Sequence, residues 1–386
     1  MKIAMVTLYD IGSYGGTTKV ICDMSNELVN RSHEVGIFYF SEKVKSIPYT
    51  LDKKVIMENC CVGLVDRFLR NAFIAKVLGV FSLGRKNRRI SRCRWDSRNK
   101  SKAFGLKLEK FNPDIVISFS QMATYMLMAD LQLKAPVITM LHSNPEAYFK
   151  RLEFNLFKPY LERCAAIQVL MPEYKRIVQH FLNARHIEYI PNVVPQYGDI
   201  KDLRLPVIVC VGRVAPVKRQ HLLVEAFALI SSKYPEWRVE LWGSADGEYA
   251  EKLRILIEKR HLTGVVSMKG NTNDVKNKLL KASIFVLTSE REGFSLALGE
   301  AMSMGLPAIG CKSCSSINSM IRNGENGYLC SDAPEDIATS IERLIKDPLK
   351  RKQMGERAKA DMVQYSSDRV YEKWERLFYK VKMFDC

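Results

Sequence analysis

The chain has 386 residues and carries 59 Lys and Arg against 42 Asp and Glu, a formal net charge of +17. With 47% hydrophobic and 26% charged residues it has the composition of a globular protein, which excludes an intrinsically disordered chain. The length predicts two domains, and no uncharged apolar run reaches 18 residues, which argues against a membrane-spanning helix.

The first half alternates short apolar runs with helical patterns. Strands are predicted at 2–8, 34–40, 114–119, 137–141, 166–169 and 186–190. The segment 17–30 has the apolar spacing of an amphipathic helix. Residues 1–8 are too short for a signal sequence and lack a cleavage site, so they are read as the first strand and a cytoplasmic location is expected.

The same alternation returns in the second half. Further strands are predicted at 207–211, 239–241, 265–268, 284–287 and 308–310. The intervening Ile190-Pro-Asn-Val-Val-Pro195 breaks the pattern. The sequence therefore predicts an α/β protein of two doubly wound domains, 1–194 and 195–369, with the ligand between them.

The most informative segment runs from Ser289 to Met302, Ser-Glu-Arg-Glu-Gly-Phe-Ser-Leu-Ala-Leu-Gly-Glu-Ala-Met. It follows the strand predicted at 284–287, so Glu292 lies in a strand-to-helix loop and Glu300 within the helix predicted at 295–304. Backbone amides at the start of that helix are suited to an anion; they belong to Gly293, Phe294, Ser295 and Leu296. Carboxylates that can accept hydrogen bonds from hydroxyl groups, next to backbone amides that can bind a phosphate, indicate a binding site for a sugar nucleotide.

This segment resembles the Glu-x7-Glu signature of the family-4 retaining glycosyltransferases, also called glycosyl transferases group 1. The resemblance covers nearly the whole chain and implies the GT-B fold, in which two Rossmann-like domains face a central cleft. It also implies that a C-terminal helix, at about 370–386, crosses back onto the first domain.

A second match is Val211-Gly-Arg-Val-Ala-Pro-Val-Lys218, where a predicted strand meets a helix. Arg213 and Lys218 supply one forked and one compact cation for a diphosphate. They resemble the Gly-Arg-x4-Lys clamp of the family. No Asp-x-Asp is present to hold a divalent ion, so we expect no metal and no cofactor, with protein cations stabilising the leaving group.

Other matches to the family are shorter. Gly15 and Gly16 match a pair that approaches the donor phosphate and the acceptor, although a plain strand-to-helix turn fits their spacing equally. His142 matches a histidine that contacts the donor sugar and supports the reacting carbon. Gly243 and Lys269 lie in loops that resemble those taking the nucleotide base.

The sequence differs from the family pattern in the segment after Gly310, where the family often has a carboxylate residue preceded by Pro or Asn. This chain has Ser319 there, which affects inferences about donor choice. The ten cysteines are scattered, and only Cys311 and Cys314 have the spacing of a metal or redox pair. Because no second pair accompanies them, reduced thiols are expected rather than a zinc site.

The excess positive charge is concentrated between Arg67 and Lys110, which holds fourteen Lys and Arg but only two acidic residues. An apolar face at helical spacing, from Leu64 to Phe81, precedes the densest basic run. The segment resembles an interfacial helix, so we predict contact with an anionic membrane at the inner face of the cytoplasmic membrane. The alternative is that the apolar face packs on the first sheet beside a solvated basic loop.

Together these features predict a retaining, metal-independent hexosyltransferase. Its catalytic residues would be Glu292, His142, Arg213 and Lys218, and its donor a UDP-linked sugar. The expected acceptor is a hydroxyl of a glycan or polyprenyl-diphosphate-linked glycan in bacterial O-antigen, lipopolysaccharide or capsule synthesis. The alternatives are a sugar-phosphate synthase or phosphorylase of the same fold, and a basic nucleic-acid-binding module. Only charge favours the module, so no nucleic-acid partner is predicted.

Overall fold

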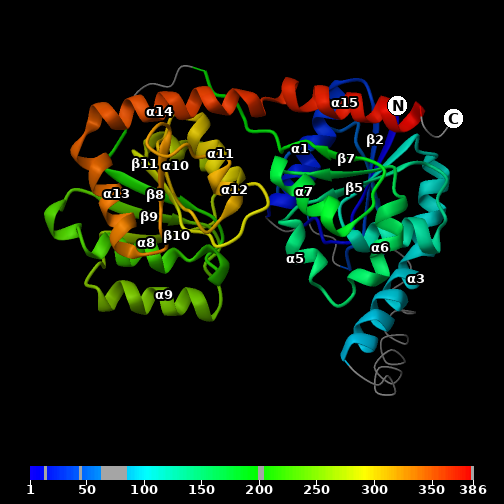
Figure 1. The fold of residues 1–386 in the computed structure, drawn as a ribbon, viewed down its shortest axis with the longest axis horizontal. Coiled ribbons are helices and arrows are strands. Elements are labelled where there is room, and N and C mark those ends of the chain that lie inside the picture. The colour runs from blue at the N-terminus through cyan, green and yellow to red at the C-terminus, as the bar shows by residue number, and fades with distance from the viewer. Residues whose placement is uncertain (13–14, 43–45, 62–84, 199–203, 384–386) are drawn as a thin grey trace. The chain divides into compact units, whose positions relative to one another are not determined.

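The computed structural model divides the chain into two compact units (Figure 1). The first contains Met1–Pro191 and Glu372–Cys386, and the second contains Asn192–Tyr371. The sequence predicts this boundary at 194/195, within the segment that breaks the strand pattern. The structure describes residues 1–12, 15–42, 46–61, 85–198 and 204–383. The apolar face predicted at 64–81 lies outside the described residues.

The first unit is built on a seven-stranded parallel sheet with the order β3-β2-β1-β4-β5-β6-β7. Its strands are β1 (Lys2–Val6), β2 (Glu34–Tyr39), β3 (Ile56–Asn59), β4 (Ile115–Ser118), β5 (Val137–Leu141), β6 (Ala166–Val169) and β7 (Ile187–Tyr189). Its helices are α1 (Gly16–Asn30), α3 (Arg85–Phe111), α4 (Gln121–Tyr125), a π-helical turn (Met126–Asp130), α5 (Pro145–Phe149), α6 (Phe154–Arg163) and α7 (Pro172–Phe181).

The second unit is built on a six-stranded parallel sheet with the order β10-β9-β8-β11-β12-β13. Its strands are β8 (Val207–Val211), β9 (Arg238–Trp242), β10 (Val266–Gly270), β11 (Ile284–Leu287), β12 (Ala308–Cys311) and β13 (Gly327–Cys330). Its α-helices are α8 (Gln220–Ala228), α9 (Glu248–Lys259), α10 (Val275–Lys281), α11 (Leu296–Ser303), α12 (Ser315–Asn318), α13 (Pro334–Lys346) and α14 (Pro348–Met362). Short 3-10 turns lie at Pro216–Lys218, Ser231–Lys233 and Val363–Tyr365.

The predicted α/β class with two parallel sheets is confirmed. Central strands such as β4, β5 and β11 are buried along their whole length, as parallel strands covered on both faces require. Two edge strands, β3 and β13, are absent from the strands predicted from the sequence. Each has four residues and none of the continuous burial of the central strands, so no apolar run marked it.

A helix at the carboxyl end of the chain, α15 (Ser367–Met383), starts in the second unit and continues into the first from Glu372. Within the first unit, Trp374 and Phe378 are buried. Glu375 accepts from Nε2 of His33 at 2.8 Å, and the Nζ of Lys380 lies 2.9 Å from Glu188. The predicted return of the C-terminal helix onto the first domain is therefore confirmed.

The basic helix α3 uses one face inside the first unit. Ser97, Phe104 and Leu108 are buried on that face, and the Ser97 hydroxyl donates to Asp130. The ammonium of Lys100 lies 4.4 Å from the centroid of the Phe40 ring. Among the helices described, none combines the length and the apolar character that crossing a bilayer requires.

Candidate functional site

The carboxyl ends of β8 and β11 place the strongest sequence matches in the second unit. Because these strands are parallel neighbours, the loops that follow them emerge at one edge of the sheet. Arg213 follows β8 and its side chain is exposed, while its backbone carbonyl accepts a hydrogen bond from Nε2 of the buried Gln220 side chain at 3.0 Å. Lys218 ends the 3-10 turn of the same loop. Glu292 comes from the loop after β11.

Lys218 and Glu292 form an ion pair. The Nζ of Lys218 lies 2.5 Å from Oε1 of Glu292, and the two side chains are 23% and 12% exposed. The aliphatic stem of Lys218 passes 3.6 Å from the position that a Cβ on Gly212 would occupy. The structure thus brings together one residue that the sequence assigned to a diphosphate and one that it assigned to a sugar.

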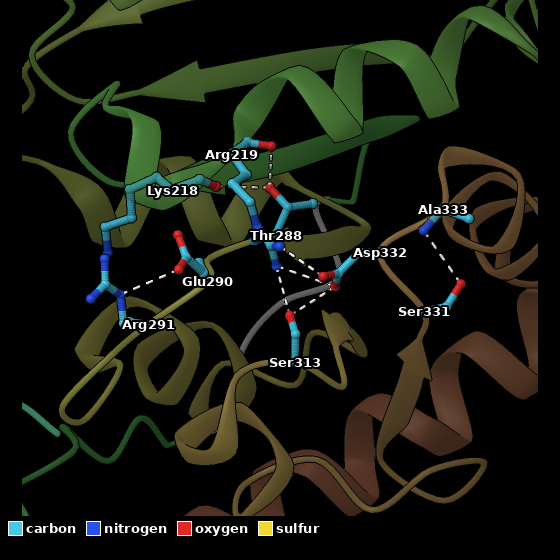
Figure 2. A network of polar contacts seen from close by, with 9 residues as sticks. All are labelled: Lys218, Arg219, Thr288, Glu290, Arg291, Ser313, Ser331, Asp332 and Ala333. Carbon is cyan, nitrogen blue, oxygen red and sulfur yellow. Dashed lines mark hydrogen bonds and ion pairs between the residues drawn. The ribbon is translucent and has the colours of Figure 1, made fainter. Parts of the chain in front are cut away.

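Next to this pair, Arg219 connects three strand-end loops (Figure 2). Its guanidinium donates to the Thr288 carbonyl after β11 at 2.9 Å, to the Ser313 hydroxyl after β12 at 2.8 Å, and to both oxygens of Asp332 after β13. The Thr288 hydroxyl in turn donates to the carbonyl of Lys218 at 2.9 Å. Arg219 therefore holds in place the loop that carries Lys218.

The charge of Asp332 is matched to this role. Burial by itself raises the pKa of the Asp332 carboxyl, but hydrogen bonds from Arg219 and Ser313 outweigh it and leave the pKa below its usual range. The carboxylate is therefore charged at neutral pH, and the forked contact with Arg219 is a charge-assisted pair. No motif in the sequence marked this group, because its members lie on four separate loops.

The loops after β8, β9 and β10 pack backbone to backbone. The amide of Gly212 donates to the Trp242 carbonyl at 2.8 Å, and the amide of Gly243 donates to the Gly270 carbonyl at 2.8 Å. A Cβ on Gly243 would lie 2.3 Å from the Gly212 oxygen, and its φ of 141° also favours glycine. Gly243 thus permits the close approach of two site loops. Lys269 is exposed, with its Nζ 3.8 Å from Glu240.

The helix α11 begins as predicted at the same sheet edge. Ser295 is its N-cap, with the hydroxyl accepting from the Leu298 amide at 3.4 Å. Phe294 is buried, and its ring packs edge-on against Tyr365 at 5.4 Å. Glu300 lies in the middle of the helix and is half-buried. This end of the helix presents backbone N–H groups and the positive end of the helix dipole to an anion.

His142 belongs to the first unit, directly after β5. Its ring stacks on Phe119, with centroids 5.1 Å apart and planes 12° apart. Burial lowers the pKa of His142 to about 4, so the imidazole is neutral at neutral pH. Its Nε2 is buried with no hydrogen-bond partner among the described residues. A neutral ring with one nitrogen unused can hydrogen-bond a hydroxyl but supplies no positive charge.

Gly15 and Gly16 lie at the start of α1, also in the first unit. Gly15 is the N-cap in an extended conformation, and Gly16 is the first helical residue. The amide of Gly15 donates to the Tyr49 hydroxyl at 3.2 Å. A Cβ on Gly15 would meet no atom of the described residues within 4 Å. The surroundings of Gly15 within the unit therefore leave room for a side chain, so packing there does not require glycine.

Cys311 and Cys314 are both buried and free. Burial raises the pKa of the Cys311 thiol to about 12, which keeps it protonated. No group of three or more His, Cys, Asp or Glu suited to a metal occurs in the part of the chain that the structure describes. Ser319 lies at the end of α12, where its exposed side chain donates to the Ser315 carbonyl at 3.2 Å.

Two family models match the chain, one for each half. Residues 14–196 match the model described as Glycosyltransferase Family 4, and residues 200–361 match the one described as Glycosyl transferases group 1. Together they account for most of the sequence.

Among curated proteins, the chain is similar to an uncharacterised glycosyltransferase of Haemophilus influenzae. The two are 24% identical, and the match covers 97% of this chain and 99% of that protein. It is also similar to the lipopolysaccharide core biosynthesis glycosyltransferase LpsE of Rhizobium meliloti, with 29% identity over 45% of this chain and 49% of LpsE. The chain therefore spans nearly all of the first relative and about half of the second.

Among solved structures, the chain is similar to a variant of TarM from S. aureus, crystallised in complex with fondaparinux, α-GlcNAc-glycerol and UDP. The TM-score is 0.79 at 17% identity, and the match covers 98% of this chain and 99% of TarM. At this identity the likeness concerns the fold.

Proposed function

Because the chain belongs to the glycosyltransferases whose two domains these models describe, we propose that it transfers a hexosyl unit from a nucleotide sugar to a hydroxyl group with retention at the anomeric carbon. The observation that carries the proposal is the convergence of Lys218, Glu292 and the start of α11 at one sheet edge. Arg213 and Glu300 belong to the same two loop-and-helix segments.

Each group has a task that follows from its chemistry. Arg213 and Lys218 stabilise the charge that grows on the diphosphate as its bond to the sugar breaks. Glu292 accepts hydrogen bonds from sugar hydroxyls, and Glu300 accepts them from the ribose. Lys269 lies within β10 rather than in the loop expected from the sequence. The loop that carries Gly243 and the carboxyl end of β10 provide backbone groups for the base, which we propose is uracil.

The ion pair between Lys218 and Glu292 has a consequence for donor binding. The Lys218 ammonium has three donor hydrogens, so it can keep one on Glu292 and direct others to diphosphate oxygens. Sharing Lys218 in this way would hold Glu292 charged and oriented next to the sugar. The same contact would couple recognition of the sugar to recognition of the diphosphate.

Retention follows if the acceptor attacks from the side of the leaving group. The bond between the anomeric carbon and the phosphate oxygen breaks, and a bond from the acceptor oxygen forms on the same face. The acceptor proton passes to the departing phosphate oxygen. His142 and the segment Gly15–Gly16 of the first unit would position the sugar and the acceptor, as the family resemblance implies.

For the acceptor, we propose a glycan or a polyprenyl-diphosphate-linked glycan of a bacterial surface polysaccharide. Support comes from the relative LpsE, which is named for lipopolysaccharide core synthesis. The exposed side of α3, which carries Arg94, Arg98 and Lys102, would hold the protein at an anionic membrane.

The proposal is tested by binding and by product stereochemistry. UDP should raise the melting temperature more than GDP or ADP, because a ligand that binds only the folded state stabilises it. With a UDP-hexose and a glycan acceptor, NMR of the product should show the anomeric configuration of the donor. An inverted product would exclude the proposed mechanism, and transfer only to a sugar phosphate would favour the synthase alternative.

Activity is also expected to persist in EDTA. Arg213 and Lys218 provide the positive charge that a metal ion supplies in other transferases, so chelation should leave the rate of UDP release within about twofold. The measurement is the steady-state rate before and after chelation, then with added Mg²⁺ or Mn²⁺. A rate that falls to background and returns with either ion would show that these cations are not sufficient.

A further inference from the structure

A second group of polar and aromatic side chains lies at the carboxyl edge of the first sheet. Tyr9 follows β1, Ser143 follows β5, and Tyr148 and Arg151 lie in and just after α5. Because β1 and β5 each neighbour β4 in the parallel sheet, their carboxyl ends reach the same edge. None of these four side chains has a role in the donor chemistry described above.

Tyr148 is the centre of the group. The guanidinium carbon of Arg151 lies 5.0 Å from the centroid of its ring, and its hydroxyl is 2.8 Å from the hydroxyl of Ser143. Tyr9 is 57% exposed. Partial burial raises the pKa of the Tyr9 hydroxyl, the charge of Tyr148 raises it further, and Arg151 and Ser120 lower it. Ser143 and Arg151 each contact Tyr148, and Tyr9 lies at the same edge of the sheet, close enough for its pKa to depend on Tyr148 and Arg151.

The helix α5 is anchored from its other side. Phe149 is buried, with its ring centroid 4.9 Å from that of Phe154 and 4.8 Å from that of Phe181. Asn144 caps the helix by accepting from the Glu146 amide at 3.0 Å. These contacts fix a helix too short to be stable alone, and they fix Tyr148 relative to the sheet edge.

The charges around α5 are unequal. The ammonium of Lys150 lies 2.6 Å from Glu146, so this pair is locally neutral. Arg151 is exposed and has no carboxylate partner among the described residues. A guanidinium stacked on an aromatic ring keeps its in-plane N–H donors available, and those donors match the geometry of a phosphate or carboxylate.

We propose that Tyr9, Tyr148 and Arg151 form an acceptor-recognition site for a sugar that carries an anionic group. The tyrosine rings face the apolar side of the sugar, the hydroxyls of Tyr148 and Ser143 bond its hydroxyls, and Arg151 binds the phosphate or carboxylate. This inference rests on the proposed function, and it specifies the charge of the acceptor.

The test compares three probes, glucose 6-phosphate, glucuronate and glucose, by ligand-detected NMR titration. UDP is present at saturation to occupy the cations of the second unit. The wild type should bind at least one anionic sugar about tenfold more tightly than glucose, because a charge-assisted hydrogen bond contributes at that level. Arg151→Gln should remove the preference. Lys150→Gln, the matched loss of one neighbouring cation, should keep it.

The two anionic probes distinguish a phosphate from a carboxylate as the recognised group. Equal affinity for the three sugars, equal loss of preference in both variants, or no binding of any probe by the wild type would overturn the inference. The proposed function has a separate readout in the same protein preparations measured without saturating UDP or acceptor sugar, because UDP binding and hydrolysis of a UDP-hexose do not require an acceptor. If the wild type neither bound UDP nor hydrolysed a UDP-hexose, the proposed function itself would be overturned.

Discussion

Replacement of Arg213 by alanine is expected to lower kcat for sugar transfer by about 100- to 1,000-fold, the usual effect of removing one group that stabilises charge in a transition state. The negative charge on the diphosphate is greatest as the bond to the sugar breaks, so the loss should fall on kcat more than on KM. The side chain of Arg213 is exposed and its backbone contacts do not depend on it, so the fold should be unchanged. The measurement is steady-state release of UDP at several donor concentrations.

Glu300→Ala serves as the contrasting variant. Contacts to the ribose are similar in the ground state and the transition state, so this change should raise the donor KM by about tenfold and leave kcat within a few-fold. Arg254→Ala is the matched control, because Arg254 is another exposed arginine of the second unit, 2.8 Å from Glu251. If Arg213→Ala were as active as Arg254→Ala, the assignment of the leaving-group site would be wrong.

Much of the fold was predictable because the central strands of parallel sheets are continuous apolar runs. The predicted strands at 137–141, 166–169, 207–211 and 284–287 have the observed bounds of β5, β6, β8 and β11. Edge strands have only one neighbour and are partly exposed, so their sequence carries a weaker signal. The segment Ile56–Asn59 includes Glu58 and Asn59 and reads equally well as a loop.

The candidate site was predictable where its residues share one short segment. Glu292, Ser295 and Glu300 lie within nine residues, and a strand followed by a helix fixes their relation. The hydrogen bonds of Arg219 to the three strand-end loops were not predictable. Asp332, for example, lies 113 positions away in the sequence and is brought near Arg219 only by the order of the strands in the sheet. The contact of Arg151 with Tyr148 has a weak sequence signal, the spacing of three residues at a helix end.

The basic segment illustrates how the structure refines an interpretation of charge. Of its cations, Lys100 lies over Phe40, and Lys107 is 2.6 Å from Glu58. Arg89 is 3.0 Å from Glu153, a buried carboxylate that would lose its partner if Arg89 were replaced. These three cations have internal roles. Exposed cations on α3 include Arg94, Arg98 and Lys102, which are spaced four residues apart, and the exposed Leu106 continues the stripe.

The stripe of Arg94, Arg98 and Lys102 is expected to bind anionic membranes. Like charges four residues apart destabilise a helix by a few tenths of a kcal/mol per pair, and none of the three has an ion-pair partner within the described ranges. Near an anionic surface each cation contributes about 1 kcal/mol. Changing all three to glutamine should therefore weaken binding to phosphatidylglycerol vesicles roughly 100-fold in a sedimentation assay, since 1.4 kcal/mol corresponds to a tenfold change.

The control removes the same three charges elsewhere, as Lys252→Gln, Arg254→Gln and Lys259→Gln on α9 of the second unit. If only the net charge of the protein mattered, both triple variants would bind the vesicles equally weakly. If α3 docks on the membrane, the variant of α3 should bind more weakly than the variant of α9. Salt gives a second criterion, because the Debye length falls from about 10 Å at 0.1 M to about 3 Å at 1 M and a surface attraction must fall with it. Docking through α3 would be contradicted if the fraction of protein bound to the vesicles did not change with salt concentration. It would also be contradicted if that fraction were the same for the two triple variants. In that case the exposed cations of α3 would be assigned to binding an acceptor rather than to binding a membrane.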